Sequence, residues 1–288
     1  MTQSAEHALS QAAHLRRVQR YYTNTESRLG YRFLLGETKH FGWYGHGHRM
    51  WGFSAAMRRM EHVLASRLDL PAGSLVLDAG CGVGDVARRL AAVHRLRVNG
   101  IDVLEFNIAL ARRRAAAAGL GGLLEFSVGD YHDLPHPDGC FDAVYTMETL
   151  VHAIDPVRVL AEFRRVLRPA GRLVMFEYSR TPSAELSREA DEALRTMCEL
   201  AAMPAMLILD HGRLEELLAD AGFGVASVID VSANVLPMLR AFALAGRLPY
   251  RIGRALHRPD KVVNALSGVE MYQHRHAWRY NIYTAAKP

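Results

Sequence analysis

Three glycines within five residues follow a short apolar run in the segment "VLDAGCGVGD", which begins at residue 76. Because glycine has no side chain, a turn built from Gly80, Gly82 and Gly84 would let a ligand approach the main chain where a strand passes into a helix. A dinucleotide fingerprint requires a small residue where Asp85 stands, and no Gly-Lys-Ser/Thr phosphate loop follows. The turn therefore predicts a nucleoside-like ligand without a pyrophosphate.

The charge of this turn indicates which ligand it would bind. Asp78 precedes the glycines and Asp85 follows them, so two carboxylates would repel a pyrophosphate by roughly a few kcal/mol where water does not screen them. A cationic or zwitterionic nucleoside fits better, because Asp78 can attract positive charge while the amides at the helix start bind a carboxylate. S-adenosylmethionine (SAM) carries a sulfonium, an ammonium and a carboxylate, and we expect it here.

Two further carboxylates stand at the ends of the next expected strands. Asp102 ends the segment "RVNGID" and can accept hydrogen bonds from both ribose hydroxyls. Asp130, in "VGDYHDLP", can accept from an adenine amino group, with Tyr131 beside the ring. Each acid alone could be a loop residue or a helix cap. Together with Asp78 they favour one nucleoside site, in which Asn107 is a further candidate contact.

Strand-like and helix-like segments alternate between residues 74 and 179. We predict strands over 74–79, 97–102, 123–130, 141–148 and 171–179, and helices over 83–95, 103–119 and 156–167. This order predicts right-handed βαβ crossovers and an α/β fold with a doubly wound, Rossmann-like parallel sheet. Ligands of such sheets bind at the carboxyl ends of the strands, where the three acids fall.

Several of these segments resemble the successive motifs of class I SAM-dependent methyltransferases, among them "LDAGCGVGD", "VGDYHDLP" and "FDAVYTMETLVHAIDP". "YTMETLVHAIDP" and "RYYTNTESRLGYRFLLGETKHFGWYGHG" are similar to segments of sterol C-methyltransferases. The similarity extends to bacterial C-methyltransferases of terpenoid and prenylated natural products, including the teleocidin-type indole terpenoid enzymes. The resemblance implies cofactor contacts by Tyr21, Tyr22, Cys81, Val103 and Met147.

The resemblance also implies the domain organisation. A seven-stranded sheet would be closed by an antiparallel strand at "WRYNIYTAAKP". We expect an N-terminal helical cap or lid over residues 1–70 and the SAM-binding domain over 71–288, with inserts near 181–210 and 233–275 that form a substrate lid. A helix from Ser4 to about residue 20 would cover the cofactor or reach a second copy of the chain, which leaves a homo-oligomer open.

The methyl acceptor determines which catalytic groups are needed. Transfer to oxygen or nitrogen usually needs a base or a metal, whereas transfer to an alkene carbon makes a carbocation that aromatic rings can stabilise and that must then lose a proton. Glu148 and His152 follow the fourth strand, four residues apart, and Tyr178 closes the fifth; these three are the catalytic candidates. In the alternative, Glu148 caps a helix and His152 fills space.

The candidate substrate contacts are Phe41, Trp43, Tyr44, Met203 and Tyr272. The first three lie in "HFGWYGHGHRMWGF" at 40–53, where glycines and histidines interrupt any helical period and predict a loop that forms part of the lid. Packing in the core is the alternative for each aromatic ring.

Three hypotheses for the function follow. The first is C-methylation of an isoprenoid double bond in a terpenoid or prenylated small molecule of secondary metabolism. Sterol enzymes carry an asparagine-rich run where this chain has "IDVLEFN", which favours a smaller isoprenoid over a sterol. The second is O- or N-methylation of a phenol or amine with His152 as the base. The third, a SAM-binding regulator without activity, leaves the lid and the insert with little purpose.

The insert at 233–275 combines "VLPMLRAFALAG" with four spaced arginines, Arg247, Arg251, Arg254 and Arg258. An apolar helix beside arginines could be an interfacial membrane anchor. We favour a pocket lid, because the arginines fall among Pro and Gly and are not expected to share one helix face. If the substrate carries a diphosphate, these arginines could bind it.

Composition limits the remaining classes. The formal charge of +5 is spread among acids, which argues against nucleic acid as a partner. Three cysteines without a CxxC pair, and no apolar run of about 18 residues, predict a cytoplasmic protein with reduced thiols and no stable membrane insertion. "HGH" at 46–48 and "HRH" at 274–276 lack the further ligands that a zinc or iron site needs, so we expect no metal.

Overall fold

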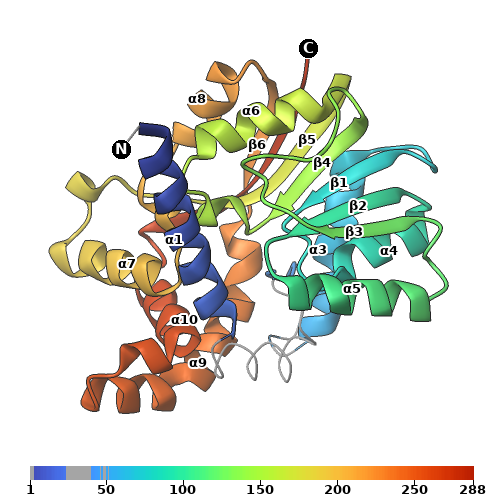
Figure 1. Ribbon diagram of the computed structural model, residues 1–288. Coiled ribbons are helices and arrows are strands. Elements are labelled where there is room, and N and C mark those ends of the chain that lie inside the picture. Colours follow the sequence, from blue (N-terminus) through green and yellow to red (C-terminus); the bar gives the residue numbers. More distant parts are fainter. Residues whose placement is uncertain (1–2, 24–39, 46, 48–49, 51) are drawn as a thin grey trace.

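The computed structural model of the chain describes residues 3–23, 40–45, 47, 50 and 52–288 (Figure 1). Its centre is a seven-stranded sheet in the order β3-β2-β1-β4-β5-β7-β6, with β7 antiparallel to both of its neighbours. The strands are β1 (Leu75–Ala79), β2 (Arg97–Asp102), β3 (Leu124–Val128), β4 (Phe141–Met147), β5 (Leu167–Arg180), β6 (Gly224–Asp230) and β7 (Trp278–Ala286). The predicted Rossmann-like sheet and its antiparallel closing strand are confirmed.

Helices cover both faces of the sheet (Figure 1). They are α1 (Gln3–Thr23), α3 (Phe53–Leu68), α4 (Asp85–His94), α5 (Glu105–Ala117), α6 (Pro156–Val166), α7 (Arg188–Leu200), α8 (Arg213–Asp220), α9 (Ser232–Ala255) and α10 (Val263–Gln273). Short 3-10 turns are η1 (Leu150–His152), η2 (Ser183–Glu185), η3 (Pro204–Leu207) and η4 (Pro259–Lys261). Within the described residues, no helix is both long enough and apolar enough to cross a membrane.

Two apolar cores lie on opposite faces of the sheet. One contains Leu160 and Phe163 of α6 and Leu218 of α8, all fully buried. The other joins α3, α4, α5, α7, α9 and α10 to the sheet, and Met60 of α3 and Met238 of α9 are buried within it. The sheet therefore has the buried, apolar strands that helices on both faces require.

Some element boundaries differ from the sequence-based expectations. Helix α4 begins at Asp85, two residues late, because Gly82 and Gly84 have φ of +52° and +75°, which a helix does not allow. Strand β3 ends at Val128, so Asp130 lies in the following loop. Strand β5 begins at residue 167 instead of 171, because Leu167 already pairs with Phe141 ahead of an irregular register.

The N-terminal segments differ from expectation in one place. The predicted loop at 40–53 ends at residue 52, since Phe53 begins α3. The predicted N-terminal helix is present as α1 and extends to Thr23. The division of the chain at residues 70 and 71 stays a prediction.

Candidate active site

The glycine turn after β1 has the backbone conformation that its sequence predicts. Gly80, Gly82 and Gly84 have φ of +91°, +52° and +75°. A Cβ on Gly80 would lie 2.5 Å from the Thr149 side chain, and one on Gly84 would lie 2.7 Å from Phe126, so these two glycines are required by packing. A Cβ on Gly82 would meet no atom within 4 Å. The turn thus leaves open space beside Gly82, at the start of α4.

A pocket opens beside this turn, at the carboxyl ends of β1, β2 and β4. It encloses about 1090 Å³ of empty space, a figure that includes its open mouth. Predicted contacts that line it are Tyr22, Asp78, Gly80, Cys81, Gly82, Asp102, Val103, Asn107, Tyr131, Met147, Glu148 and His152. Residues from the loops after four strands therefore converge at the switch point of the sheet, where such folds bind ligands.

Asp78 is the buried carboxylate of the pocket. Its side chain is 4% exposed, and Oδ2 has no hydrogen-bond partner in the described part of the chain. Burial, assisted by the nearby charge of Asp102, raises the pKa of Asp78 to about 7, although the hydroxyl of Tyr145 acts in the opposite direction. An ammonium group in the pocket would supply the partner that Oδ2 lacks.

Asp102 is held in place by the backbone. Its Oδ2 accepts from the amide of Gly82 at 2.9 Å, and its Oδ1 accepts from the amide of Leu104 at 2.8 Å and from the side chain of Asn107 at 3.1 Å. Asn107 therefore orients the carboxylate that we expected to bind ribose. The remaining lone pairs of Asp102 are those with which a diol can bond.

Asp130, the expected adenine acceptor, does not line the pocket, although both of its chain neighbours do. Its carboxylate accepts from Gln11 of α1 at 2.6 Å and from the ring and the amide of His132 at 2.6 and 3.0 Å. Burial alone would raise the pKa of Asp130, but these hydrogen bonds outweigh it and hold the pKa below its ordinary value. Tyr131, next in the chain, donates to the carbonyl of Thr149.

Glu148 lies directly after β4 at the inner end of the pocket. Its φ of +60° is unusual for a side chain of this size. Oε1 accepts from the amide of Phe41 at 2.6 Å and from the hydroxyl of Tyr280 at 2.8 Å, and Oε2 accepts from the hydroxyl of Tyr178 at 2.7 Å. Burial raises the pKa of Glu148 in spite of these three donors. Its raised pKa makes this carboxylate a stronger base than an ordinary glutamate, and it lines the pocket.

A second buried carboxylate, Glu177 of β5, supports the loop that carries Glu148. Glu177 Oε1 accepts from the amides of Thr149 and Leu150 at 2.9 and 2.8 Å and from the hydroxyl of Thr146 at 3.1 Å. Burial raises the pKa of Glu177 to about 8. Two of these hydrogen bonds hold the backbone directly after Glu148, and the third holds the side chain of Thr146 before it.

His152 has a partner at each ring nitrogen. Its Nδ1 lies 2.8 Å from the carbonyl oxygen of Ala202, which can only accept, so we assign the proton to Nδ1. Its Nε2 lies 2.8 Å from the hydroxyl of Tyr22, and its carbonyl oxygen accepts from His14 at 2.7 Å. In this tautomer Nε2 accepts from Tyr22, so Tyr22 lies between the imidazole and any acceptor in the pocket.

Helix α1 covers the pocket by contacts along its length (Figure 1). Gln11 and His14 contact Asp130 and the backbone of His152, as described above, and the guanidinium of Arg17 donates to the carbonyl of Glu199 in α7. The hydroxyl of Tyr21 donates to Asn264 of α10 at 2.8 Å. Tyr21 therefore anchors the helix, while Tyr22 lines the pocket.

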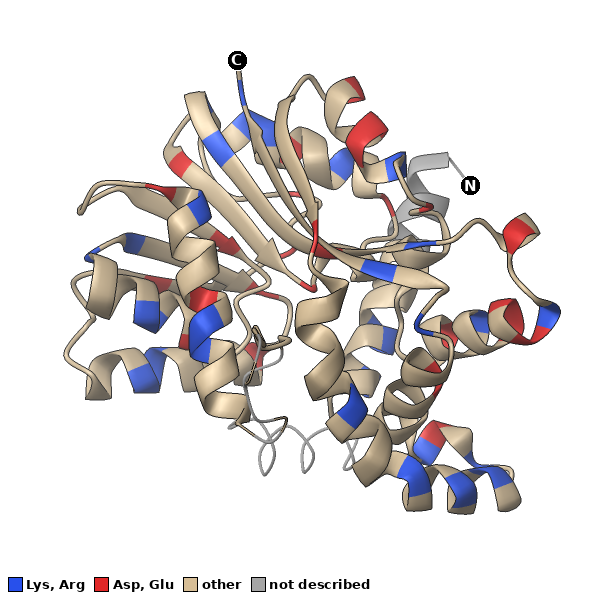
Figure 2. Cartoon of the chain, turned by 180° about the vertical axis from the view of Figure 1, so that it is seen from behind, with Lys and Arg blue, Asp and Glu red and all other residues tan. Residues whose placement is uncertain are grey.

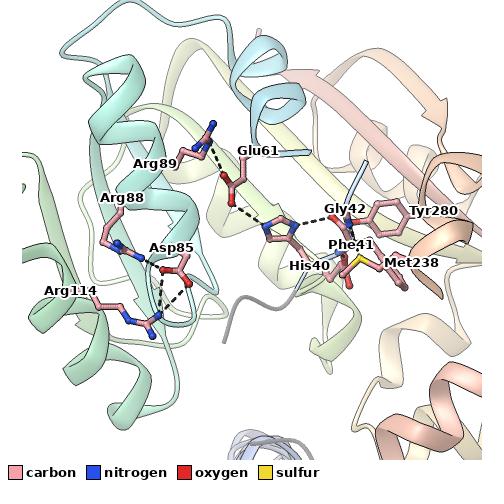
Figure 3. A network of polar contacts seen from close by, with 11 residues as sticks. His40, Phe41, Gly42, Glu61, Asp85, Arg88, Arg89, Arg114, Met238 and Tyr280 are labelled. Carbon is pink, nitrogen blue, oxygen red and sulfur yellow. Dashed lines mark hydrogen bonds and ion pairs between the residues drawn. The ribbon is translucent and has the colours of Figure 1, made fainter. Parts of the chain in front are cut away.

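A buried network connects the pocket to α3 (Figure 3). His40 lines the pocket and is 5% exposed; its Nε2 lies 3.6 Å from Glu61, which also pairs with Arg89 at 2.9 Å. Burial alone would lower the pKa of His40, but the hydrogen bond and the charge of Glu61 outweigh it and raise the pKa. His40 Nδ1 donates to the carbonyl of Phe41, which positions the amide that binds Glu148.

The expected substrate residues do not line this pocket. Phe41 packs edge-on against Tyr178 and Tyr280, at centroid distances of 6.3 and 5.6 Å, behind Glu148. Tyr44 is buried and donates to the carbonyl of Met50, and burial raises its pKa to about 12. Trp43, Met203 and Tyr272 are partly buried against the same core. The contacts of these five residues in this structure are therefore packing contacts, which was the alternative to substrate binding.

Sequence reasoning also missed several residues of the site: Gln11, His14, His40, Thr149, Glu177 and Tyr280. Residues 24–39, His46 and His48 lie outside the described residues, so neither most of the expected N-terminal segment nor the first histidine pair is placed. In the described part of the chain, no group of three or more His, Cys, Asp or Glu side chains is placed to hold a metal ion.

Comparison with known proteins identifies the family. Residues 77–175 match the family model described as a methyltransferase domain. The chain is 36% identical to the S-adenosyl-L-methionine-dependent Diels-Alderase iccD of Talaromyces variabilis, over 99% of each chain. The chain belongs to the class I SAM-dependent methyltransferases. As a SAM-dependent methyltransferase, it uses SAM as its cofactor, which confirms the resemblance seen in the sequence.

This methyltransferase has further relatives. It is 34% identical to the sterol 24-C-methyltransferase ERG6B of Gibberella zeae over 75% of its own length, but it spans only 55% of that protein. Among solved structures, the [4+2]-cyclase SpnF superposes with a TM-score of 0.68 at 29% identity, over 86% of each chain. The names of these relatives thus describe two kinds of reaction, methyl transfer to carbon and [4+2] cyclisation.

The residues of the pocket fit SAM. The open space beside Gly82 admits a ligand against the backbone, and the start of α4 offers amides to a carboxylate. The unpartnered oxygen of Asp78 suits an ammonium, and the oriented carboxylate of Asp102 suits a diol. The role of each of these residues in binding SAM stays a prediction.

Proposed function

We propose that this methyltransferase transfers the methyl group of SAM to a double-bond carbon of an isoprenoid chain in a terpenoid or prenylated small molecule. The observation that carries this proposal is Glu148, a buried carboxylate with a raised pKa at the inner end of the cofactor pocket. Methylation of an alkene requires a proton acceptor close to the reacting carbons, because the carbocation must lose a proton.

The chemistry assigns one task to each group near Glu148. Bound SAM supplies an electrophilic methyl group. When an alkene carbon takes that methyl, its partner carbon becomes a cation, and a neighbouring C–H bond must give up a proton while its electrons form the new double bond. Glu148 accepts the proton in this proposal, and Tyr178 and Tyr280, whose rings pack with Phe41 behind it, orient its carboxylate.

The O- or N-methylation alternative has less support. His152 would have to act as the base, but its Nδ1 bonds to a carbonyl and its Nε2 faces the hydroxyl of Tyr22. It could take a proton only through Tyr22. Glu148 also lines the pocket, and burial raises the pKa of its carboxyl group.

A [4+2] cycloaddition in the same pocket is a second candidate reaction. It is favoured by the similarity over the full length to a Diels-Alderase and by the resemblance to a solved [4+2]-cyclase. Such a reaction moves no methyl group, so the position of a labelled methyl distinguishes the two candidates.

The test is incubation of the protein with SAM labelled with 13C in the methyl group and a panel of terpenes, prenylated indoles, polyenes and phenols. We expect the label in a product with a new carbon–carbon bond, detected by NMR. Label on oxygen or nitrogen would support the alternative with His152, and a cyclised, unlabelled product would support the cycloaddition. A matched pair of variants, Glu148→Gln and His152→Gln, then identifies the residue on which turnover depends.

We propose several further properties together with this function. The substrate is small and apolar, residues 1–70 form a helical cap, and the inserts near 181–210 and 233–275 form a lid. We also propose a cytoplasmic location and leave assembly into a homo-oligomer open.

A further inference from the structure

The second half of α9 presents an apolar stripe to solvent. Leu244, Leu248 and Ile252 recur every four residues, and their side chains are 39%, 67% and 49% exposed. Leu256, directly after the last residue of the helix, is 66% exposed. Because residues four apart lie on one face of a helix, these four form one stripe.

The opposite face of α9 packs against the protein and fixes the direction of the stripe. Gly246 and Gly253 are buried, and a Cβ on either would lie within 3.1 Å of Ala265 or Val262. Tyr250 is buried between them and donates to Glu270 of α10 at 2.6 Å. The leucines therefore point away from α10 by the geometry of the helix.

Arginines border the same stripe. The sequence predicts that proline and glycine keep the four arginines from sharing a helix face; this is wrong for Arg247, Arg251 and Arg254, since α9 continues through Pro249 to Ala255, while Arg258 lies outside the helix. Arg247, Arg251 and Arg254 are exposed and are spaced by four and three residues, so they lie along one side of the leucines. We call this stripe with its arginines the α9 face.

The net positive charge of the chain is concentrated here, which corrects the expectation that it is spread among acids. Residues 240–261 contain six of the 35 Lys and Arg residues but only one of the 30 Asp and Glu residues, so the rest of the chain has equal numbers of each. That one acid, Asp260, is paired with Arg258 and Lys261. Figure 2 shows several of the Lys and Arg positions, coloured blue on the ribbon, at the end of the molecule where α9 ends and the chain turns toward α10.

We propose that the α9 face docks on the surface of a bilayer that contains anionic phospholipids. Leucine and isoleucine side chains on a helix can enter the boundary between headgroups and acyl chains, while arginines beside them bind lipid phosphates. No ion pair of Arg247 or Arg251 is found within the described residues, so both guanidinium groups can bind phosphate. A positively charged face beside an apolar stripe complements such a membrane in both respects.

Helix α9 connects the α9 face to the segment that contacts Glu148. Phe242, two residues before Leu244, stacks on Phe41 at a centroid distance of 6.4 Å, and the amide of Phe41 binds Glu148. Met238, one turn earlier, accepts from the amide of Gly42. One helix thus contacts the segment that binds Glu148 and also carries the α9 face. A membrane-dissolved apolar substrate would meet the enzyme next to this segment.

The test measures binding of the full chain to sedimented vesicles of phosphatidylcholine, with and without one third of phosphatidylglycerol. We expect binding to the anionic vesicles only, weakened by salt. The double variant Arg247→Gln/Arg251→Gln should lower the partition coefficient roughly 25-fold, about fivefold for each lost arginine. Leu248→Asn/Leu256→Asn should lower it at least tenfold, because two exposed apolar side chains no longer enter the membrane.

Matched controls separate docking from general effects. Two control variants change exposed residues on other surfaces: Arg113→Gln on α5 removes an arginine, and Val157→Asn on α6 removes an apolar side chain. Both variants should bind vesicles as the parent protein does. Thermal unfolding checks that each variant is folded, and light scattering reports its mass. Absence of binding to anionic vesicles, or equal binding by the arginine variant, would overturn docking. A change of mass in the leucine variant without loss of vesicle binding would instead make this face a contact between copies.

Discussion

At the scale of single residues, Glu148 combines a raised pKa with three hydrogen-bond donors that hold its carboxylate in one orientation. A glutamine at this position keeps the shape of the side chain but cannot accept a proton at neutral pH. We therefore expect Glu148→Gln to lower kcat by a factor of about 10² to 10⁴, the usual range for loss of a general base. The affinity for S-adenosylhomocysteine, measured by calorimetry, should change less than threefold, or roughly 0.6 kcal/mol. Equal losses in both quantities would assign Glu148 to cofactor binding.

Asp78 predicts how cofactor binding depends on pH. Its pKa in the folded protein is about 7, above the ordinary value of 3.8, so it destabilises the cofactor-free fold as it ionises. The stability that the neutral acid provides is complete below about pH 4 and is lost as pH rises through 7, by an amount on the order of a few kcal/mol. A bound ammonium favours the charged form, so affinity for S-adenosylhomocysteine should rise over the same interval.

The variant Asp78→Asn tests both parts of this prediction. Since asparagine does not ionise, the free energy of unfolding of the cofactor-free protein should fall less between pH 4 and 7 than that of the parent, and its Tm at pH 8 should exceed that of the parent. Affinity for S-adenosylhomocysteine should be low at every pH. A variant with the pH profile of the parent protein would show that another group titrates there.

At the scale of elements, the loop from β4 to η1 depends on Glu177 of β5. Because the pKa of Glu177 is about 8, the acid is mostly neutral at pH 7 and acts through the oxygen that accepts three hydrogen bonds. Glu177→Gln keeps that oxygen and should retain most of the activity. Glu177→Ala leaves two buried amides without partners and should lower the free energy of unfolding by about 3 kcal/mol, measured by urea denaturation, and kcat with it. If the glutamine variant were as inactive as the alanine variant, activity would depend on the carboxyl group of Glu177 and not on the hydrogen bonds that its oxygen accepts.

Helix α1 covers the pocket through polar contacts, and its release should accelerate cofactor exchange. Tyr22→Phe removes the hydroxyl that bonds to His152, while its ring still packs against Tyr21. We expect S-adenosylhomocysteine to dissociate about five- to tenfold faster, in stopped-flow measurements, from the loss of one hydrogen bond of about 1 kcal/mol. The control Thr23→Val, at the exposed end of α1, should leave the rate unchanged. An unchanged rate in Tyr22→Phe would show that the cover does not limit release.

The elements that sequence predicts well are those with local signals. The strand, glycine turn and helix around Gly80 follow from the absence of side chains and from apolar periodicity, and the three acids fall near the strand ends as expected. Contacts made across the sheet have no such signal. Gln11 meets Asp130, and Glu177 meets Thr149, only after the chain has folded. For Phe41 the sequence predicts a substrate contact, but its ring packs against Tyr178 and Tyr280, because composition does not distinguish a pocket wall from the layer behind it.

At the scale of the whole molecule, the sheet separates a core that supports the fold from one that also supports the site. Leu160 of α6 is fully buried in the core opposite α3, α4 and α5. Leu160→Ala should lower the free energy of unfolding by about 2–5 kcal/mol, measured by chemical denaturation, through loss of packing and an unfilled cavity. The affinity for S-adenosylhomocysteine should stay as in the parent protein. A marked loss of affinity would mean that the two cores are coupled through the sheet.

The central claim is that the cofactor pocket of this methyltransferase delivers a methyl group to carbon, with Glu148 receiving the proton. The most direct measurement is the amount of S-adenosylhomocysteine formed per molecule of an accepted isoprenoid substrate consumed, by quantitative mass spectrometry. We predict a ratio of one, with a product heavier by one methylene unit. Consumption of the substrate to an isomer of equal mass, with SAM left intact, would contradict methyl transfer.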